Sequence, residues 1–165
     1  MLGECTVIFV TVGTQLSFDR LITAVDKWSV NNPSDKVFAQ VGPSDYAPKH
    51  IEFADFVAPD VADGLFKQAS LIVSHAGMGS ILTALKYKKP ILIMPRRASL
   101  GEHRNDHQLA TAKWLGSTPG ITVAKDESEI EILLNNRNTL NGGGGISDFA
   151  SPDLVKRLQE YILAN

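Results

Sequence analysis

Short runs of apolar residues alternate along the chain with stretches in which apolar and polar residues recur at helical spacing. The apolar runs are rich in valine and isoleucine, which is typical of strands buried on both faces of a parallel sheet. We expect six strands, at residues 6–12, 36–41, 51–57, 71–74, 91–94 and 122–124. This alternation predicts an α/β domain in which helices flank a Rossmann-like parallel sheet.

Between the expected strands, apolar residues stand three and four positions apart, the pattern of a helix with one face on a sheet. We expect helices at residues 18–28, 61–69, 80–87 and 105–115. Ser17 and Asp60 stand just before two of these stretches, and such side chains commonly cap a helix. Trp28 and Trp114 fall on helical faces and are expected in the core.

The chain changes character near its end. Residues 1–135 are expected to form one α/β domain. Residues 136–151 include four consecutive glycines and are interpreted as a flexible loop. Pro152 then opens a last expected helix at 152–165. The apolar stripe of this helix fits either core packing or the docking of a partner chain.

Composition narrows the class of protein. With 165 residues, 44% of them hydrophobic and 21% charged, the chain suits one domain with a buried core. A net charge of -2 argues against a nucleic-acid partner. The single cysteine, Cys5, excludes an intramolecular disulfide and is typical of a reducing compartment. No apolar run approaches the roughly 18 residues that span a bilayer, and the start lacks a secretory signal, so we expect a cytoplasmic protein.

Glycine turns after the strands exclude several nucleotide-binding motifs. Gly13 and Thr14 follow the first expected strand, where a dinucleotide-binding fold needs Gly-x-Gly-x-x-Gly, and only Gly13 is present. The sequence has no Gly-x-x-x-x-Gly-Lys-Ser/Thr, so it is not a P-loop protein. It also lacks the Gly-x-Ser-x-Gly elbow of a hydrolase.

A second glycine turn, residues 74–80 with the sequence SHAGMGS, separates an expected strand from a helix. Open α/β sheets bind ligands at the carboxyl ends of such strands. Free amides at the start of the helix form an anion site with the helix dipole, to which Ser80 adds a hydroxyl and His75 a ring N–H or a positive charge. A tight turn with a capping serine and a packed histidine fits the same residues, so both interpretations stay open.

A polar segment, GEHRNDHQ at residues 101–108, follows the next strand and is expected beside this second glycine turn. Asp106 accepts hydrogen bonds and Gln108 both accepts and donates them, which is what sugar hydroxyls need. A solvated loop before a capped helix fits equally well. His103 and His107 are four residues apart and could hold a metal with Asp106, but the sequence has no further ligand cluster, and we expect no metal and no cofactor.

Basic residues gather at Lys86, Lys88, Lys89, Arg96 and Arg97. The simplest interpretation is a solvated surface on a nearly neutral protein. Contact with an anionic membrane face or with an acceptor diphosphate is the alternative.

Three motifs in this order, VTVGTQ with FDRL within residues 10–21, SHAGMGSI at 74–81 and DHQ at 106–108, resemble the C-terminal half of family 28 glycosyltransferases. The likeness covers about residues 6–125. It is nearest to the small stand-alone members, which include the catalytic subunit of the eukaryotic dolichol-linked N-acetylglucosamine transferase and bacterial exopolysaccharide transferases split over two chains. The resemblance implies one half of a GT-B fold that binds a nucleotide diphosphate sugar, usually UDP-linked.

The resemblance also implies substrate-binding roles. The residues expected near the diphosphate are Gly13, Thr14, His75, Gly77, Met78, Gly79 and Ser80. Asp106 and Gln108 match the pair that reads the hydroxyls of the donor sugar, and His107 lies between them. Larger relatives bind the ribose with a glutamate shortly after the serine, where this chain has Leu82 and Thr83, so Thr83 or a backbone group would serve.

Finally, the resemblance implies a second chain, because GT-B enzymes bind donor and acceptor between two halves and this chain has room for one. We expect a catalytic, donor-binding subunit that moves a sugar from a UDP-sugar to a lipid-linked acceptor. A membrane-anchored partner would supply the acceptor half and hold the chain at the cytosolic membrane face. His75 is the candidate catalytic residue, and Arg96, Arg97 or Arg104 could stabilise the leaving diphosphate. The missing ribose carboxylate leaves an alternative, a non-catalytic nucleotide-sugar-binding or scaffold module.

Overall fold

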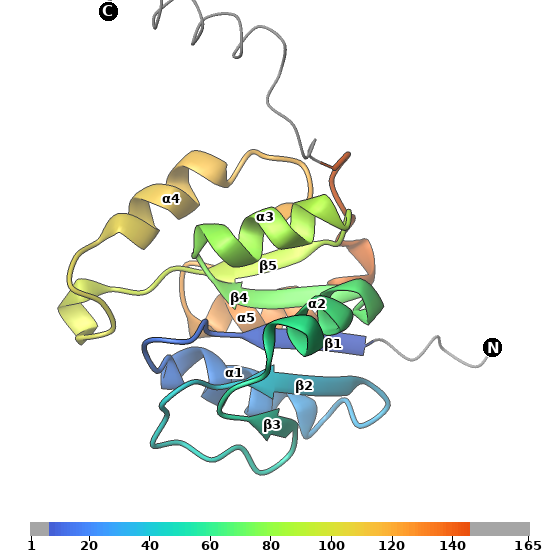
Figure 1. Ribbon diagram of the computed structural model, residues 1–165, viewed down its shortest axis with the longest axis vertical. Coiled ribbons are helices and arrows are strands. Elements are labelled where there is room, and N and C mark those ends of the chain that lie inside the picture. Colours follow the sequence, from blue (N-terminus) through green and yellow to red (C-terminus); the bar gives the residue numbers. More distant parts are fainter. Residues whose placement is uncertain (1–6, 146–165) are drawn as a thin grey trace, which may run out of the picture.

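The structure, a computed structural model, describes residues 7–145 (Figure 1). Within these residues six strands form one sheet, all of whose neighbouring pairs are parallel, in the order β3-β2-β1-β4-β5-β6. The strands are β1 (Val7–Thr11), β2 (Lys36–Gln40), β3 (Glu52–Ala54), β4 (Leu71–His75), β5 (Ile91–Met94) and β6 (Ile121–Val123). The predicted parallel sheet is confirmed, although the third strand is shorter than the expected 51–57.

Helices cover both faces of the sheet. They are α1 (Asp19–Ser29), α2 (Pro59–Gln68), α3 (Met78–Lys86), α4 (His107–Leu115) and α5 (Glu127–Asn135), with short 3-10 helices η1 (Ala98–Leu100) and η2 (Arg137–Thr139). Buried residues of α1 and α5 pack on one face, and those of α2, α3 and α4 on the other. Figure 1 shows α2 and α3 in front of the sheet and α1 and α5 behind it. The domain therefore has three layers, α/β/α.

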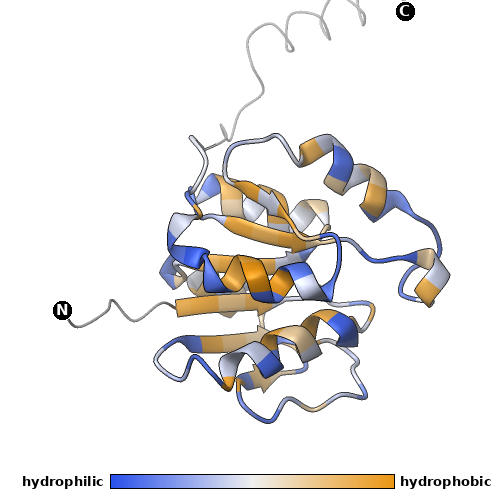
Figure 2. Ribbon diagram, turned by 180° about the vertical axis from the view of Figure 1, so that it is seen from behind, coloured by the Kyte–Doolittle hydropathy of each residue, from blue (hydrophilic) through white to orange (hydrophobic). Residues whose placement is uncertain are grey.

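Side chains alternate between the two faces along the central strands. On β1, Ile8 and Val10 face α1 and α5, whereas Phe9 faces α2 and α3. On β4, Val73 likewise faces α1 and α5, and Ile72 faces α2 and α3. The central strands are accordingly the most hydrophobic segments of the ribbon in Figure 2. Burial on both faces explains why these strands appear in the sequence as continuous apolar runs.

Two of the expected helix caps are wrong. α1 begins after Phe18, and no side chain caps its first turn, so Ser17 is not the cap. α2 begins at Pro59, one residue before Asp60, because the fixed φ of proline suits the first helical position. Asp60 lies instead within the first turn, where its carboxylate still favours the positive end of the helix.

The two tryptophans lie in different environments. Trp28 is 3% exposed, as expected of a core residue, and its Nε1 donates a hydrogen bond of 2.9 Å to Asn135 Oδ1. Trp114 is 74% exposed, so its expected place in the core is wrong. α4 packs on the core through Ala112 and Leu115, and Trp114 falls outside the face that they form.

Helix α5 was not among the elements expected from the pattern of apolar residues. The Asp126 carboxylate accepts hydrogen bonds from the backbone amides of Ser128 and Glu129 and caps this helix. Ile130 and Leu134 are fully buried in the cluster that α1 also joins. A signal was present, because an aspartate three residues before a glutamate, followed by apolar residues, is a typical helix start.

Residues 136–145 belong to the segment interpreted as a flexible glycine-rich loop. They include η2, and Leu140 packs against the core. A side chain at Gly142 would overlap the backbone between α3 and β5. The proposed domain boundaries stay a prediction, and the expected helix at 152–165 lies outside the described residues, as does Cys5. Among helices of the described residues, none has the length and apolar character needed to cross a membrane.

Candidate functional site

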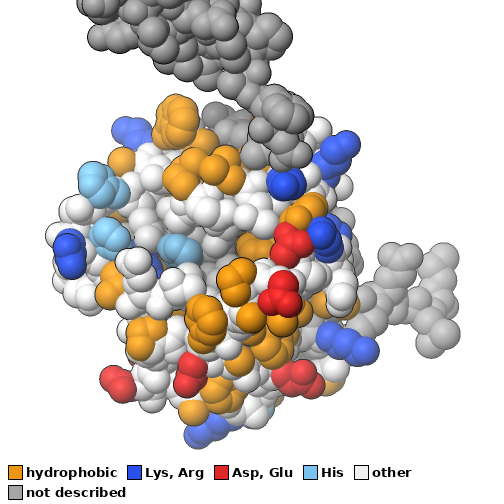
Figure 3. Space-filling model, viewed as in Figure 1, with side chains coloured by type: hydrophobic (Ala, Val, Ile, Leu, Met, Phe, Trp, Pro, Cys, Tyr) orange, Lys and Arg blue, Asp and Glu red, His pale blue; other side chains and the backbone are white. Residues whose placement is uncertain are grey.

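The carboxyl ends of β1, β4 and β5 meet at one edge of the sheet. Thr11 is paired with Ser74, and His75 with Met94, so the loops that follow these strands lie side by side. The strand order also changes direction between β1 and β4, where open α/β sheets form a crevice for ligands. In Figure 1 these loops lie at the left of the sheet, and in Figure 3, drawn from the same side, histidine side chains gather there.

A pocket of about 490 Å³ opens at this edge and is called the polar pocket below. It is lined by Val12, Gly13, Thr14, Gln15, Leu16, His75, Gly77, Met78, Gly79, Ser80, Arg96, His103 and Gln108. The structure thus brings together most of the residues that the sequence assigned to the site. It adds five residues that were not among those substrate-binding residues, Val12, Gln15, Leu16, Arg96 and His103.

The helix α3 presents its N-terminus to the polar pocket. Its N-cap is Gly77, no side chain caps it, and its first turn carries no acidic residue. The first helical hydrogen bond joins the amide of Ile81 to the carbonyl of Gly77, so the preceding amides have no partner within the helix. Such amides, together with the helix dipole, attract an anion such as a phosphate. A side chain at Gly79 would meet no atom within 4 Å, which shows open space in front of these amides.

The ring of His75 lies between two glycines of this site. A methyl group at Gly77 would overlap His75 Nε2, and one at Gly13 would lie 3.2 Å from His75 Cε1. Gly13 also has a φ of +79°, which other residues rarely adopt. These glycines are therefore required by the packing of the histidine itself, besides any approach of a ligand.

His75 is neutral near pH 7. Burial, followed by the positive charge of Arg96, lowers its pKa to about 4. Its Nδ1 lies 3.2 Å from Ser74 Oγ and 3.5 Å from the carbonyl oxygen of Thr11. Donation by the serine hydroxyl to Nδ1 would leave the ring proton on Nε2, whereas a hydrogen bond to the Thr11 carbonyl, which can only accept, would need that proton on Nδ1. His75 can thus offer an N–H, whereas the positive charge considered from the sequence is absent.

Gln108 connects two loops of the site. It is 8% exposed, and its Oε1 accepts hydrogen bonds from the amides of Ala76 and Arg96 at 3.2 and 3.1 Å. The oxygen is thereby occupied within the protein. The amide group of Gln108 faces a ligand as a donor, rather than as the donor and acceptor suggested by the sequence.

Three of the expected substrate-binding residues do not line the polar pocket. Asp106 is exposed, and its Oδ1 accepts a hydrogen bond of 2.9 Å from the amide of Ala98. His107 is exposed at the first position of α4. The hydroxyl of Thr83 donates to the carbonyl of Gly79 at 2.8 Å, and its side chain faces a neighbouring pocket.

That neighbouring pocket, of about 550 Å³, is called the apolar pocket. It is lined by Phe9, Thr11, Gly13, Thr14, Gln40, Phe56, Val57, Pro59, Ala62, Asp63, Phe66, Gly79, Ser80 and Thr83. It shares Gly13, Thr14, Gly79 and Ser80 with the polar pocket, so the loop after β1 and the N-terminus of α3 lie between the two. A ligand with an apolar end, a central anion and a polar end would fit this arrangement.

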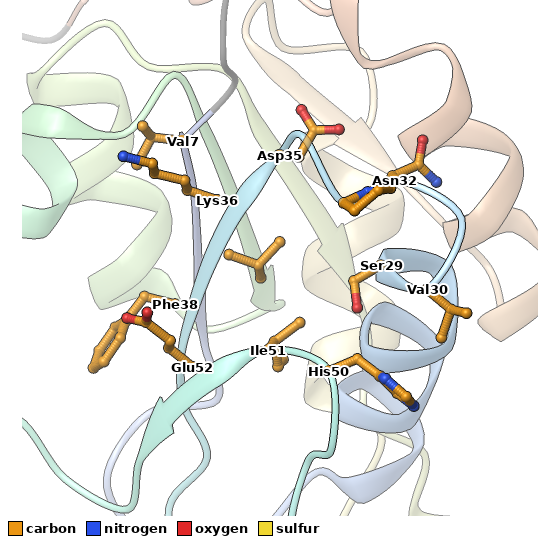
Figure 4. A pocket seen from close by; sticks show the side chains of 12 residues that line it. Val7, Ser29, Val30, Asn32, Asp35, Lys36, Phe38, His50, Ile51 and Glu52 are labelled. Atoms are coloured by element: carbon orange, nitrogen blue, oxygen red, sulfur yellow. The ribbon is translucent and has the colours of Figure 1, made fainter.

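A larger pocket, of about 610 Å³, lies at the opposite edge of the sheet. Figure 4 shows that its lining side chains do not converge, because Lys36 and Phe38 lie on one side of β2 and Ser29 and His50 on the other. It contains no helix N-terminus directed at its centre and none of the residues singled out from the sequence. The chemistry therefore favours the polar and apolar pockets.

The burial of Arg96 was not expected from the sequence. It was grouped with the basic residues of a solvated surface and also named among three arginines that could stabilise the leaving diphosphate, and it is 2% exposed and lines the polar pocket. Its position directly after Pro95, at the carboxyl end of an expected strand, was a signal in favour of the site. Within residues 7–145, no group of three or more histidine, cysteine or acidic residues is arranged to hold a metal ion.

The fold and these pockets define an α/β domain with a ligand site at the point where the strand order reverses, and the chain belongs to the family described as glycosyltransferase family 28 C-terminal domain, which matches residues 7–140. It is 33% identical over 119 residues to the human "UDP-N-acetylglucosamine transferase subunit ALG13". This alignment covers 66% of the chain but 10% of that relative, so the chain spans about a tenth of its length.

Solved structures agree on the fold. The glycotransferase of kitacinnamycin superposes with a TM-score of 0.63 at 18% identity, over 96% of this chain and 38% of its own. The NMR structure of ALG13 superposes with a TM-score of 0.59 at 16% identity, over 94% and 95% of the two chains. The expected fold, a family 28 C-terminal domain equivalent to one half of a GT-B fold, is confirmed.

Proposed function

We propose that this chain is the catalytic, donor-binding subunit of a glycosyltransferase that moves a sugar from a UDP-sugar to a lipid-linked acceptor. The observation that carries the proposal is the uncapped N-terminus of α3 at the junction of a polar and an apolar pocket. Membership of the glycosyltransferase family supports it. The human relative named above is called a subunit of a UDP-N-acetylglucosamine transferase, which suggests that sugar as the donor.

The donor lies across the two pockets in this proposal. The nucleoside enters the apolar pocket, where Phe56 and Val57 offer apolar surface to a base. The diphosphate lies on the amides at the start of α3, next to the hydroxyl of Ser80. The sugar then extends into the polar pocket, where the amide group of Gln108 and the ring of His103 are available to its hydroxyls. Thr83 faces the nucleoside side, and Asp106 and His107 would approach the sugar only through movement of their loop.

In the reaction, the bond between the anomeric carbon and the diphosphate oxygen breaks, and a bond to the acceptor oxygen forms. Negative charge grows on the departing diphosphate, and donors already aimed at it lower the barrier. The α3 amides, the Ser80 hydroxyl and the Nε2–H of His75 supply such donors. His75 is the catalytic residue in this account, as a hydrogen-bond donor. The proton of the acceptor hydroxyl passes to a base that we assign to the partner chain.

A membrane-anchored partner completes the cleft in this proposal. The kitacinnamycin glycotransferase is matched over 38% of its length, which supports the view that this chain is one part of a larger catalytic unit. The partner would carry the lipid-linked acceptor and hold this chain at the cytosolic face of the membrane. A non-catalytic module that binds nucleotide sugars is the alternative, and it shares the donor site but has no turnover.

A transfer assay separates these functions. Radiolabelled UDP-N-acetylglucosamine is supplied to the full chain, to membranes of the source organism that lack it, and to both together. Label in the lipid fraction is expected only from the combination, and a His75→Ala variant that still folds should lower its rate. Donor binding without transfer in the combination would support the non-catalytic module. Transfer by the chain alone would contradict the need for a partner.

A further inference from the structure

Arg96 is a buried cation whose role the proposed function leaves open. It is the largest of the fully buried side chains, and its guanidinium carbon lies 4.8 Å from the centre of the Phe18 ring. Burial lowers its pKa to about 10, so the side chain remains charged at neutral pH. A buried charge is costly unless hydrogen bonds satisfy it, so its partners identify what it does.

Each of the hydrogen bonds that its guanidinium forms within the described chain goes to a backbone carbonyl. Its Nη2 donates to Val12 and Leu16 at 2.7 and 2.8 Å. Its Nη1 donates to Ser17 and, at 3.4 Å, to Glu102. Carbonyl groups neutralise no formal charge, and the Glu102 carboxylate attracts the guanidinium electrostatically without a hydrogen bond to it.

These bonds orient residues 12–17, called the nucleotide loop below. Three of its carbonyls, at Val12, Leu16 and Ser17, point to Arg96, and a fourth, at Gly13, accepts a hydrogen bond of 2.9 Å from Gln40 Nε2. Carbonyl oxygens turned into the pocket would repel a diphosphate. With these carbonyls held by side-chain donors, the nucleotide loop is compatible with an anion beside the α3 amides.

Arg96 is itself fixed by neighbouring loops. Its amide donates to Gln108 Oε1, which also binds the amide of Ala76 in the turn before α3. Glu102 accepts from the amide of Arg97 at 2.8 Å and pairs with Arg20 at 2.7 Å, which anchors the loop after β5 to α1. Arg96 thus lies where the loops that follow β1, β4 and β5 converge.

We propose that Arg96 is a positioning residue, which shapes the nucleotide loop for a diphosphate by holding its carbonyl groups away from the polar pocket. The proposal rests on the proposed donor-binding function, but the shape of the loop can be measured without a ligand. A planar guanidinium can donate to several carbonyls at once, whereas a lysine ammonium keeps the charge but reaches fewer of them. Arg96→Lys therefore keeps the positive charge but loses part of the set of hydrogen bonds, whereas Arg96→Met loses both.

The experiment compares Arg96→Lys, Arg96→Met and the control Arg97→Met in the full chain. Arg97 is adjacent and also donates to a backbone carbonyl, that of Lys125. Although it was considered from the sequence as a partner of the diphosphate, it does not line the polar pocket, and the proposed function gives it no role. Amide hydrogen exchange is measured without ligand at Val12 and Gly13, whose amides donate to the carbonyl of Gln40 and to Thr11 Oγ1, and UDP affinity is measured by calorimetry. We expect exchange of these amides to become at least about tenfold faster in both Arg96 variants, with UDP affinity lowered at least about tenfold, corresponding to about 1.4 kcal/mol. Arg97→Met should change neither quantity.

The outcomes distinguish this proposal from the proposed function. Wild-type exchange at Val12 and Gly13 in a folded Arg96→Lys variant would overturn the positioning role, even if Arg96→Met fails to fold. Unchanged UDP affinity in that variant would also overturn it, because charge alone would then suffice. If wild-type protein does not bind UDP, the proposed function fails, whereas faster exchange in the variants would still support control of the nucleotide loop by Arg96.

Discussion

His75 illustrates, at the scale of single residues, how packing sets chemical character. Its ring is enclosed by Gly13 and Gly77, and burial beside Arg96 keeps it neutral. A histidine that had to carry charge would be paired with a carboxylate, whereas this one contacts a hydroxyl and a backbone carbonyl, of Ser74 and Thr11. The residue is therefore suited to donate a hydrogen bond at a constant protonation state through the physiological pH range.

This environment predicts a pH-dependent stability. The folded-state pKa of His75, about 4, lies below the ordinary value of 6.5, so the unfolded chain binds the proton more readily between these values. The contribution of His75 to the free energy of unfolding is fully present when the pH is above 6.5, the ordinary pKa of histidine, and it is lost as the pH falls toward about 4. By linkage, we expect the free energy of unfolding to fall by roughly 2–3 kcal/mol from this group alone.

Urea unfolding of the wild type and of His75→Gln, between neutral pH and about pH 4, measures this contribution. Glutamine keeps a polar side chain but does not titrate in this range. The difference in stability between the two proteins should shift in favour of the variant as the pH falls. Parallel curves would show that His75 titrates normally, in conflict with the buried, neutral ring.

At the scale of elements, the strands were predictable and the loops between them less so. All six strands were predicted. Continuous apolar runs identified β1, β4 and β5, because burial on both faces leaves little room for polar residues, whereas β2 and β3 are partly exposed and include polar residues. The second glycine turn was also found, since glycines between a strand and a helix are distinctive. The burial of Arg96 was not predicted, because its partners are backbone carbonyls of a loop far away in the sequence. Every residue has a backbone carbonyl, so the sequence does not identify such partners.

The N-terminus of α3 is the element on which ligand binding depends. The first turns of α1, α2 and α5 carry acidic residues, whereas those of α3 and α4 carry none, and α4 has Asp106 at its N-cap. A carboxylate in such a turn stabilises a helix by about 0.3–1 kcal/mol but would occupy the place of an anionic ligand. Gly79→Asp should therefore retain or raise thermal stability while it lowers UDP affinity at least about tenfold.

Gly64→Asp is the matched control, because Gly64 lies in α2 and a side chain there also meets no atom within 4 Å. It should leave UDP affinity unchanged. Calorimetric titration and thermal unfolding of both variants check these expectations. A folded Gly79→Asp protein with wild-type affinity would remove α3 from the binding site.

At the scale of the molecule, one sheet edge gathers the whole donor site. The loops after β1, β4 and β5 supply the polar pocket, and α2 with α3 adds the apolar pocket beside it. The larger pocket lies at the other edge, built from the starts of β1, β2 and β3. Chain topology, rather than pocket size, thus distinguishes the site, because parallel strands place their functional loops at their carboxyl ends.

The central claim is that a nucleotide diphosphate binds at the start of α3, and an NMR titration of the isotopically labelled full chain with UDP tests it most directly. We predict that the largest amide shifts fall on Met78, Gly79 and Ser80 and on residues 13–16. Inorganic pyrophosphate should shift the same amides without affecting those around Phe56. Shifts centred on Ser29 and Lys36 at the opposite edge, or no shifts at millimolar UDP, would contradict the account.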